Sequence, residues 1–136
     1  MLLANDQKLN ISSKVENLTL VQKLIEDVCD QMDLSKDHFG NIAVAVSEAV
    51  TNAIQHGNKS DPSKSVDIHF HSEENAVSFL IRDEGNGFDY HNLPDPTLPE
   101  NLEKPNGRGV FLMKNLADTV NFIDSGKCVE LKFFIK

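Results

Sequence analysis

The segment from Asn41 to His56 constrains the fold more than any other part of the sequence. Its apolar residues recur at the three- and four-residue spacing of an amphipathic helix, so we expect a helix from about Lys36 to His56. Ser35 offers an N-cap, and Gly57 is suited to the left-handed conformation just past a helix end. Because most residues of this helix between its polar positions are apolar, much of the helix should be buried.

The rest of the chain alternates between the periods of helices and strands. Alternating apolar residues predict strands, and three- and four-residue spacing predicts helices. In chain order we expect a strand at 8–13, a helix at 18–32, the helix at 36–56, strands at 66–70 and 76–81, a helix at 109–116, and strands at 120–123 and 129–135. This order predicts an α/β (α+β) two-layer sandwich, with helices on one face of a mixed, mainly antiparallel sheet.

A long segment without a regular period interrupts this pattern. It runs from Asp83 to Gly107, begins with closely spaced glycines and continues with prolines among polar residues. Such a long loop inside a compact domain usually has a function, and we predict a lid at about residues 88–107. The chain of 136 residues fits one domain over residues 1–136.

Charge and the lengths of apolar runs exclude several classes of protein. Thirteen Lys and Arg stand against 21 Asp and Glu, and the net charge of -8 argues against direct binding of nucleic acid. No apolar run approaches the roughly 18 residues of a membrane span, and the N-terminus lacks a secretory signal. We therefore expect a cytoplasmic protein without membrane contact. Cys29 and Cys128 fit no metal or redox motif, and we expect two reduced core thiols.

The first motif that carries chemistry is a polar stripe on the helix of residues 36–56. Glu48, Asn52 and His56 stand four residues apart, and this spacing places them on one side of the helix. Their neighbours are apolar, so the stripe faces either a cavity or hydrogen-bonding partners. The alternative is the exposed polar face of an ordinary amphipathic helix.

The second motif lies at the end of the strand at 76–81. There Asp83 is followed by Gly85 and Gly87, so a carboxylate that can accept from an exocyclic amine precedes two residues that allow close backbone approach. The alternative is a plain turn. A dinucleotide fingerprint is excluded, because Tyr90 stands where the third glycine of that motif would fall.

The third motif opens the helix at 109–116. Gly107, Arg108 and Gly109 lead directly into this helix, where free N–H groups, the positive end of the helix dipole and the arginine charge would attract an anion. The alternative is a flexible loop that ends at a helix N-terminus.

Taken together and in this order, the three motifs resemble the nucleotide site of the GHKL (Bergerat-fold) ATPases. The run from Glu48 to Gly57 is most similar to the anti-sigma factor serine/threonine kinases, and Arg82 to Gly87 and Gly107 to Gly109 also match that subfamily. The resemblance spans nearly the whole chain. It implies a Bergerat ATP-binding fold that uses ATP and Mg²⁺.

The resemblance also implies roles for individual residues. Asn52 would bind Mg²⁺, Glu48 would act as general base toward a hydroxyl of a protein substrate, and Asp83 would hold the adenine amino group. Gly85 and Gly87 would shape the pocket wall, whereas the glycines and arginine of the third motif would close over the phosphates. The further nucleotide-binding residues would thus be His56, Gly85, Gly87, Gly107, Arg108 and Gly109.

The implied function is a switch between partners. An ATP-dependent protein serine/threonine kinase of this kind would act as an anti-sigma factor, bind a sigma factor and phosphorylate an anti-anti-sigma (STAS-type) protein, and such kinases commonly form homodimers. A first alternative is an ATP-responsive regulatory binding module of the same fold without phosphoryl transfer. A second is a detached histidine-kinase catalytic domain, although the sequence contains no dimerisation helix that presents a phosphoacceptor histidine.

Overall fold

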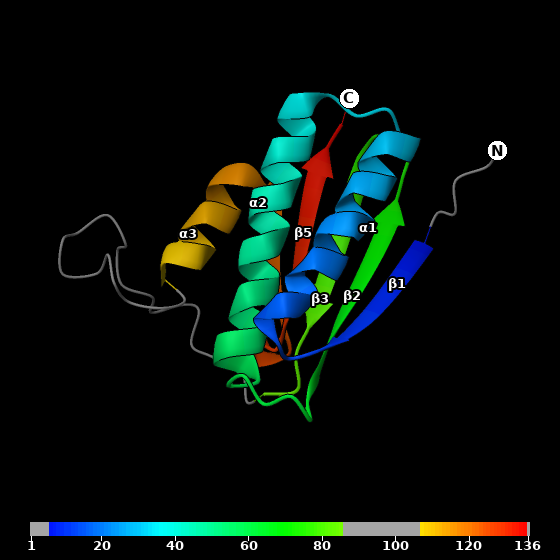
Figure 1. Cartoon of the computed structure of the whole chain (residues 1–136). Coiled ribbons are helices and arrows are strands. Elements are labelled where there is room, and N and C mark those ends of the chain that lie inside the picture. The colour runs from blue at the N-terminus through cyan, green and yellow to red at the C-terminus, as the bar shows by residue number, and fades with distance from the viewer. Residues whose placement is uncertain (1–5, 86–106, 136) are drawn as a thin grey trace.

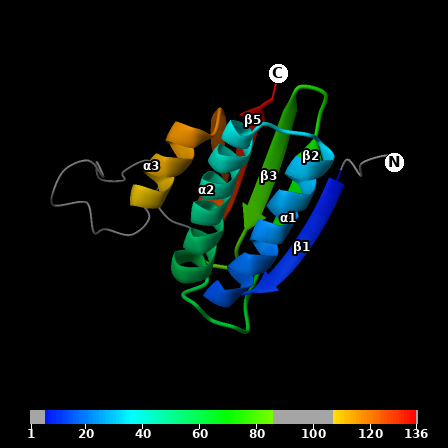
Figure 2. The ribbon, with the colours of Figure 1, turned by 45° about the horizontal axis from the view of Figure 1, so that its top comes forward.

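The computed structural model describes residues 6–85 and 107–135, which fold into two layers (Figure 1). Within these residues one layer is a five-stranded sheet, and three helices lie on one face of it, as the turned view in Figure 2 also shows. The elements are β1 (Asp6–Ser12), α1 (Leu18–Gln31), α2 (Lys36–Asn52), β2 (Ser65–Ser72), β3 (Ala76–Arg82), α3 (Gly107–Leu116), β4 (Thr119–Ile123) and β5 (Cys128–Phe134). Every predicted helix and strand is therefore confirmed, with bounds that differ by one or two residues except at the end of α2, which lies four residues before the predicted His56.

The order of the strands in the sheet is β1-β2-β3-β5-β4. All four pairings between described strands are antiparallel, which corrects the expectation of a mixed sheet in this detail. The reason is the position of β5. β3 and β4 run in the same direction, as strands on either side of a helix often do, but β5 lies between them and pairs with both.

Alternating side chains of the strands form the core against the helices. Phe70 of β2, Phe79 of β3 and Phe133 of β5 are all buried, with ring centroids 5.2 Å apart for the first pair and 6.3 Å for the second. The helices contribute Val21, Ile25 and other buried residues to the same cluster. The other side chains of the strands are mostly polar and half-buried or exposed, so helices cover only one face of the sheet.

The C-terminal end of α2 differs from the predicted regular helix. After Asn52 the chain continues into one π-helical turn, η2 (Ala53–Gly57), which a hydrogen bond from the Asn58 N–H to the Ala53 carbonyl closes at 2.9 Å. Gly57 does not adopt a positive φ, so its predicted left-handed conformation is wrong. In the segment after η2, the residues with a left-handed backbone are Lys59 and Ser60, with φ of 53° and 57°. Glycine is required at position 57 by a close contact in the candidate site, described below.

Two polar side chains are buried in the described part of the chain, those of Ser13 and Asn58. They are hydrogen-bonded to each other, from the Asn58 Nδ2 to the Ser13 Oγ at 2.8 Å. The Ser13 hydroxyl in turn donates to the Lys64 carbonyl at 2.8 Å. This chain of hydrogen bonds ties the turn after η2 to the end of β1 and the start of β2.

Cys29 and Cys128 are both buried and form no disulfide, as expected. Burial raises the pKa of the Cys29 thiol to about 11, so this group stays protonated at neutral pH. Across residues 6–85 and 107–135, none of the helices combines the length and the apolar character that crossing a membrane requires.

Candidate functional site

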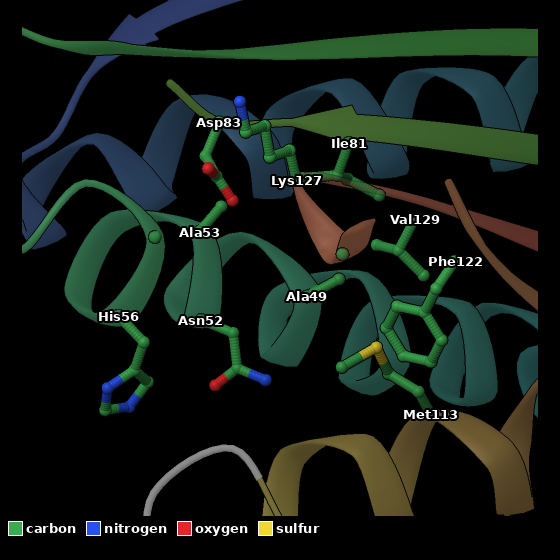
Figure 3. A pocket seen from close by; sticks show the side chains of 12 residues that line it. Ala49, Asn52, Ala53, His56, Ile81, Asp83, Met113, Phe122, Lys127 and Val129 are labelled. Carbon is green, nitrogen blue, oxygen red and sulfur yellow. The ribbon is translucent and has the colours of Figure 1, made fainter. Parts of the chain in front are cut away.

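A pocket opens between the helix layer and the ends of β3 and β5, where two of the three sequence motifs meet (Figure 3). The space between its walls, including the part open to solvent, is about 460 Å³. The described residues that line it are Ala49, Asn52, Ala53, His56, Gly57, Ile81, Asp83, Met113, Phe122, Gly126, Lys127 and Val129.

The pocket has two apolar sides that face each other. Ala49 of α2 and Ala53 of η2, one turn apart, form the helix side. The sheet side is formed by Ile81, Phe122 and Val129, and Met113 of α3 completes the apolar lining (Figure 3). The small alanines keep the slot between helix and sheet open. Such a slot suits a flat, largely apolar ring whose polar edge is recognised by a few groups.

Asp83 is the carboxylate of this pocket, and hydrogen bonds hold both its backbone and its side chain. The Asp83 N–H donates to the Lys127 carbonyl at 2.9 Å, and the Gly85 N–H donates to the Asp83 Oδ1 at 2.7 Å. Burial raises the pKa of Asp83, while the Gly85 hydrogen bond and the nearby Lys127 charge act in the opposite direction. Within residues 6–85 and 107–135, only the Oδ1 of this carboxylate accepts a hydrogen bond, which leaves the Oδ2 to accept from an amine.

Two glycines make the position of Asp83 possible. A Cβ on Gly57 would collide with the Asp83 carboxylate, and a Cβ on Gly85 would collide with the Gly57 carbonyl. Close backbone approach, rather than a left-handed turn, is therefore what requires glycine at position 57. Gly87 lies outside the described residues.

The helix stripe divides at the pocket. Asn52 and His56 line it and project toward the side on which α3 lies, as Figure 3 shows. Glu48 is half-buried one turn earlier on α2 and is not among the lining residues. Burial lowers the pKa of His56, which favours its neutral imidazole.

Asn52 is the point at which the first and third motifs meet. Its Nδ2 is buried and has no hydrogen-bond partner among the described residues. A Cβ on Gly109 would come within 2.7 Å of this atom, so the absence of a side chain there lets the first turn of α3 approach α2. An orphaned buried polar atom at a pocket suggests a ligand, because native structures rarely leave such atoms unpaired.

The structure describes less of the third motif and of the predicted lid. Gly107 and Arg108 form the first turn of α3, which gives their backbone position. The rest of the predicted lid lies outside the described residues. No group of three or more His, Cys, Asp or Glu in residues 6–85 and 107–135 is arranged to hold a metal ion.

Sequence reasoning did not assign nine of the twelve lining residues to the site, among them Met113, Phe122, Lys127 and Val129. Their strands and helix were predicted, and Phe122 and Val129 follow the apolar alternation of strands. Nothing in that alternation indicates, however, that β5 pairs with β3 and so brings Lys127 beside Asp83.

Comparison with known proteins agrees with this arrangement. The model of the histidine kinase-like ATPase domain matches residues 11–133. The serine-protein kinase RsbW of Bacillus licheniformis is 31% identical over 132 residues, which cover 90% of this chain and 81% of that protein. The serine-protein kinase RsbW of Bacillus cereus strain AH820 is 29% identical over 136 residues, which cover 95% and 84%.

A solved structure shares the fold. It contains the RsbU and RsbW domains of a Mycobacterium tuberculosis protein, and it superposes with a TM-score of 0.66 at 15% identity. The match covers 97% of this chain and 33% of the chain in that structure. The family match, the relatives and the predicted motifs all lead to one assignment. The chain belongs to the histidine kinase-like ATPase domain family and, within it, to the RsbW group of serine-protein kinases.

Proposed function

We propose that this chain is an ATP-dependent protein serine/threonine kinase that acts as a single-domain, cytoplasmic anti-sigma factor. Its substrate is an anti-anti-sigma (STAS-type) protein, and its other partner is a sigma factor. The observation that carries the proposal is a carboxylate, Asp83, at the polar edge of an apolar slot, with Asn52 on the opposite side of the same pocket. Relatives at about 30% identity that are named serine-protein kinases support the phosphoryl transfer.

Adenine occupies the apolar slot in this proposal. Its ring lies between Ala49 and Ala53 on the helix side and Val129 on the sheet side, and its amino group donates to the free oxygen of Asp83. Guanine carries a carbonyl oxygen at the corresponding position. That oxygen would face the carboxylate without a hydrogen, so Asp83 selects ATP over GTP.

The phosphates extend from the slot toward Asn52, His56 and the first turn of α3. The N–H groups of that turn, which includes Gly107 and Gly109, provide donors and the positive end of the helix dipole. The neutral His56 ring adds one N–H donor. The charge of Arg108 would complete this side of the site.

Mg²⁺ fits the site only together with the phosphates. Asn52 supplies a single amide, which agrees with the preference of Mg²⁺ for one or two protein ligands plus phosphate oxygens. Rotating the amide by 180° would put its oxygen where the unpaired Nδ2 lies. When bound, the ion would neutralise charge on the phosphoryl group being transferred.

Glu48 serves as the general base. It lies one turn before Asn52, and residues at this spacing are neighbours on a helix, roughly 5–6 Å apart at Cβ. Its carboxylate takes the proton of the substrate serine while the serine oxygen forms a bond to the γ-phosphorus. The bond from that phosphorus to the bridging oxygen breaks, and ADP leaves.

A second candidate function is an ATP-responsive binding module that does not transfer phosphate. The position of Glu48 favours it, because this residue does not line the described pocket. In that case nucleotide would change the partner surface without phosphoryl transfer.

We further propose that the protein acts as a homodimer in either case.

Asp83→Asn tests the recognition of adenine. The amide presents an N–H₂ as well as an oxygen, so we expect ATP affinity to fall about tenfold or more and the preference for ATP over GTP to shrink. Calorimetric titration of both nucleotides measures this ratio. Asp30→Asn, on the exposed side of α1, is the matched control and should bind like wild type. Equal binding of ATP and GTP by the wild-type protein would contradict the assignment.

Gly57→Ala tests the close approach beside Asp83. The added methyl group collides with the carboxylate and displaces it, so we expect ATP affinity to fall about tenfold. Gly40→Ala is the control, since no atom lies within 4 Å of its added Cβ. That variant should bind ATP normally and gain roughly 0.5–1 kcal/mol of stability, because alanine is the better helix residue. Calorimetry and urea denaturation measure the two effects.

Asn52→Ala tests the metal contact. We expect this variant to lose the Mg²⁺-dependent part of its ATP affinity, about tenfold or more, and to bind metal-free ATP nearly as wild type does. Titrations with ATP in the presence of Mg²⁺ or of a chelator measure the difference. Asn121→Ala, on exposed β4, is the control. An undiminished Mg²⁺ effect in Asn52→Ala would remove the metal role.

Glu48→Gln separates the two candidate functions. Glutamine keeps the size of the side chain but cannot act as a base, so ATP should bind as in wild type while phosphoryl transfer falls roughly 10²–10⁴-fold. Transfer of labelled phosphate to a STAS-type protein measures the rate, and Glu26→Gln, at an exposed position of α1, is the control. A fully active Glu48→Gln would exclude this residue as the base. Wild type that binds ATP but transfers no phosphate would favour the binding module.

A further inference from the structure

Asn58 directly follows the pocket residue Gly57 but does not line the pocket. Its side chain is completely buried, with 0% of its surface exposed. A buried amide is favourable only when its hydrogen bonds are made, so its partners indicate what it does.

The side chain of Asn58 joins three segments of the chain. Its Nδ2 donates to the Ser13 Oγ at 2.8 Å and to the Ser65 carbonyl at 2.9 Å, and its Oδ1 accepts the Glu84 N–H at 2.7 Å. The chemistry of the partners fixes the orientation of this amide. A backbone carbonyl only accepts and a backbone N–H only donates, so the flipped amide would lose both bonds.

Glu84, which Asn58 contacts, stands in the sequence between Asp83, the carboxylate of the pocket, and Gly85. Asp83, Glu84 and Gly85 each have their N–H bonded to a different partner. The Asp83 N–H bonds to the Lys127 carbonyl of the sheet, and the Gly85 N–H bonds to the Asp83 side chain itself. Only the Glu84 N–H is held from the helix side, by Asn58.

The Asn58 amide therefore links the Asp83 segment to the end of η2. The Asp83 carboxylate packs against Gly57, the last residue of η2. If the Asn58 amide is lost, the Glu84 N–H loses its partner in this part-buried contact, and the segment can move away from Gly57. The carboxylate would move with it, while the apolar walls of the slot would stay.

We propose that Asn58 is a positioning residue, which holds Asp83 where it recognises adenine and thereby sets the preference for ATP over GTP. This inference rests on the proposed nucleotide site. It assigns the specificity of that site in part to a residue that does not touch the nucleotide.

Ser13 provides an independent way to perturb the same amide. It lies just past the end of β1, outside the pocket, and its Oγ takes one of the two Nδ2 hydrogen bonds while it donates to the Lys64 carbonyl. Ser13→Ala removes one bond to Asn58 but leaves the Glu84 contact in place. Its effect on specificity should therefore have the same direction as that of Asn58→Ala and be smaller.

The experiment compares the ratio of the dissociation constants for GTP and ATP. Calorimetry gives this ratio for wild type, Asn58→Ala, Ser13→Ala and Asp83→Asn, each after circular dichroism has confirmed folding. Ile25→Ala is the matched control, because Ile25 is a buried residue of α1 whose truncation destabilises the core without touching the pocket or the Asn58 network. A merely structural loss lowers both affinities in proportion and leaves the ratio unchanged.

We expect the ratio to fall about tenfold in Asn58→Ala and less in Ser13→Ala, and to stay at the wild-type value in Ile25→Ala. A wild-type ratio in Asn58→Ala, with a collapsed ratio in Asp83→Asn, would overturn the positioning role and leave the proposed function intact. Wild type without a preference for ATP would overturn both. If Asn58→Ala does not fold, an unchanged ratio in Ser13→Ala overturns the inference.

Discussion

The close contact between the end of α2 and the segment that follows β3 is the constraint on which the site depends. No side chain fits at Gly57 or Gly85, because the Asp83 carboxylate and the Gly57 carbonyl fill those spaces. The helix end can therefore lie directly against the strand end. The π-helical turn η2 brings Gly57 into this contact and leads the chain on to Asn58. A carboxylate is thereby fixed beside an apolar slot, where burial and hydrogen bonding act on it together.

The two sides of α2 explain how one helix serves both the core and the site. Buried residues such as Val46 and Val50 pack in the core, whereas Ala49 and Ala53 leave room for a ring and Asn52 lies beside Gly109 of α3. A larger residue at either alanine would fill the slot. The small residues at these positions thus have the same purpose as the glycines, namely to leave space that a ligand can use.

Local structure was predictable from the sequence because it follows from local periodicity. The helices and strands were expected for this reason, whereas the grouping of Asn52, His56 and Asp83 was expected only from the resemblance to the GHKL ATPases. The insertion of β5 between β3 and β4 was not expected, since pairing between distant strands leaves no local pattern. For the same reason Lys127 was missed as a neighbour of Asp83 and Asn58 as a buried amide, because the sequence does not reveal the partners that bury them.

The order of the strands has a consequence for how the pocket is assembled. Residues 6–85 supply β1, β2, β3, α1 and α2, which are contiguous in the fold, and residues 107–135 add α3, β4 and β5. The pocket is divided between these two segments, with Asp83 on the first and Phe122 on the second. A nascent chain cannot complete the pocket until β5 has emerged from the ribosome and entered the sheet. A ligand that bridges both segments then adds its binding free energy to their association, so nucleotide would hold the two halves of the fold together.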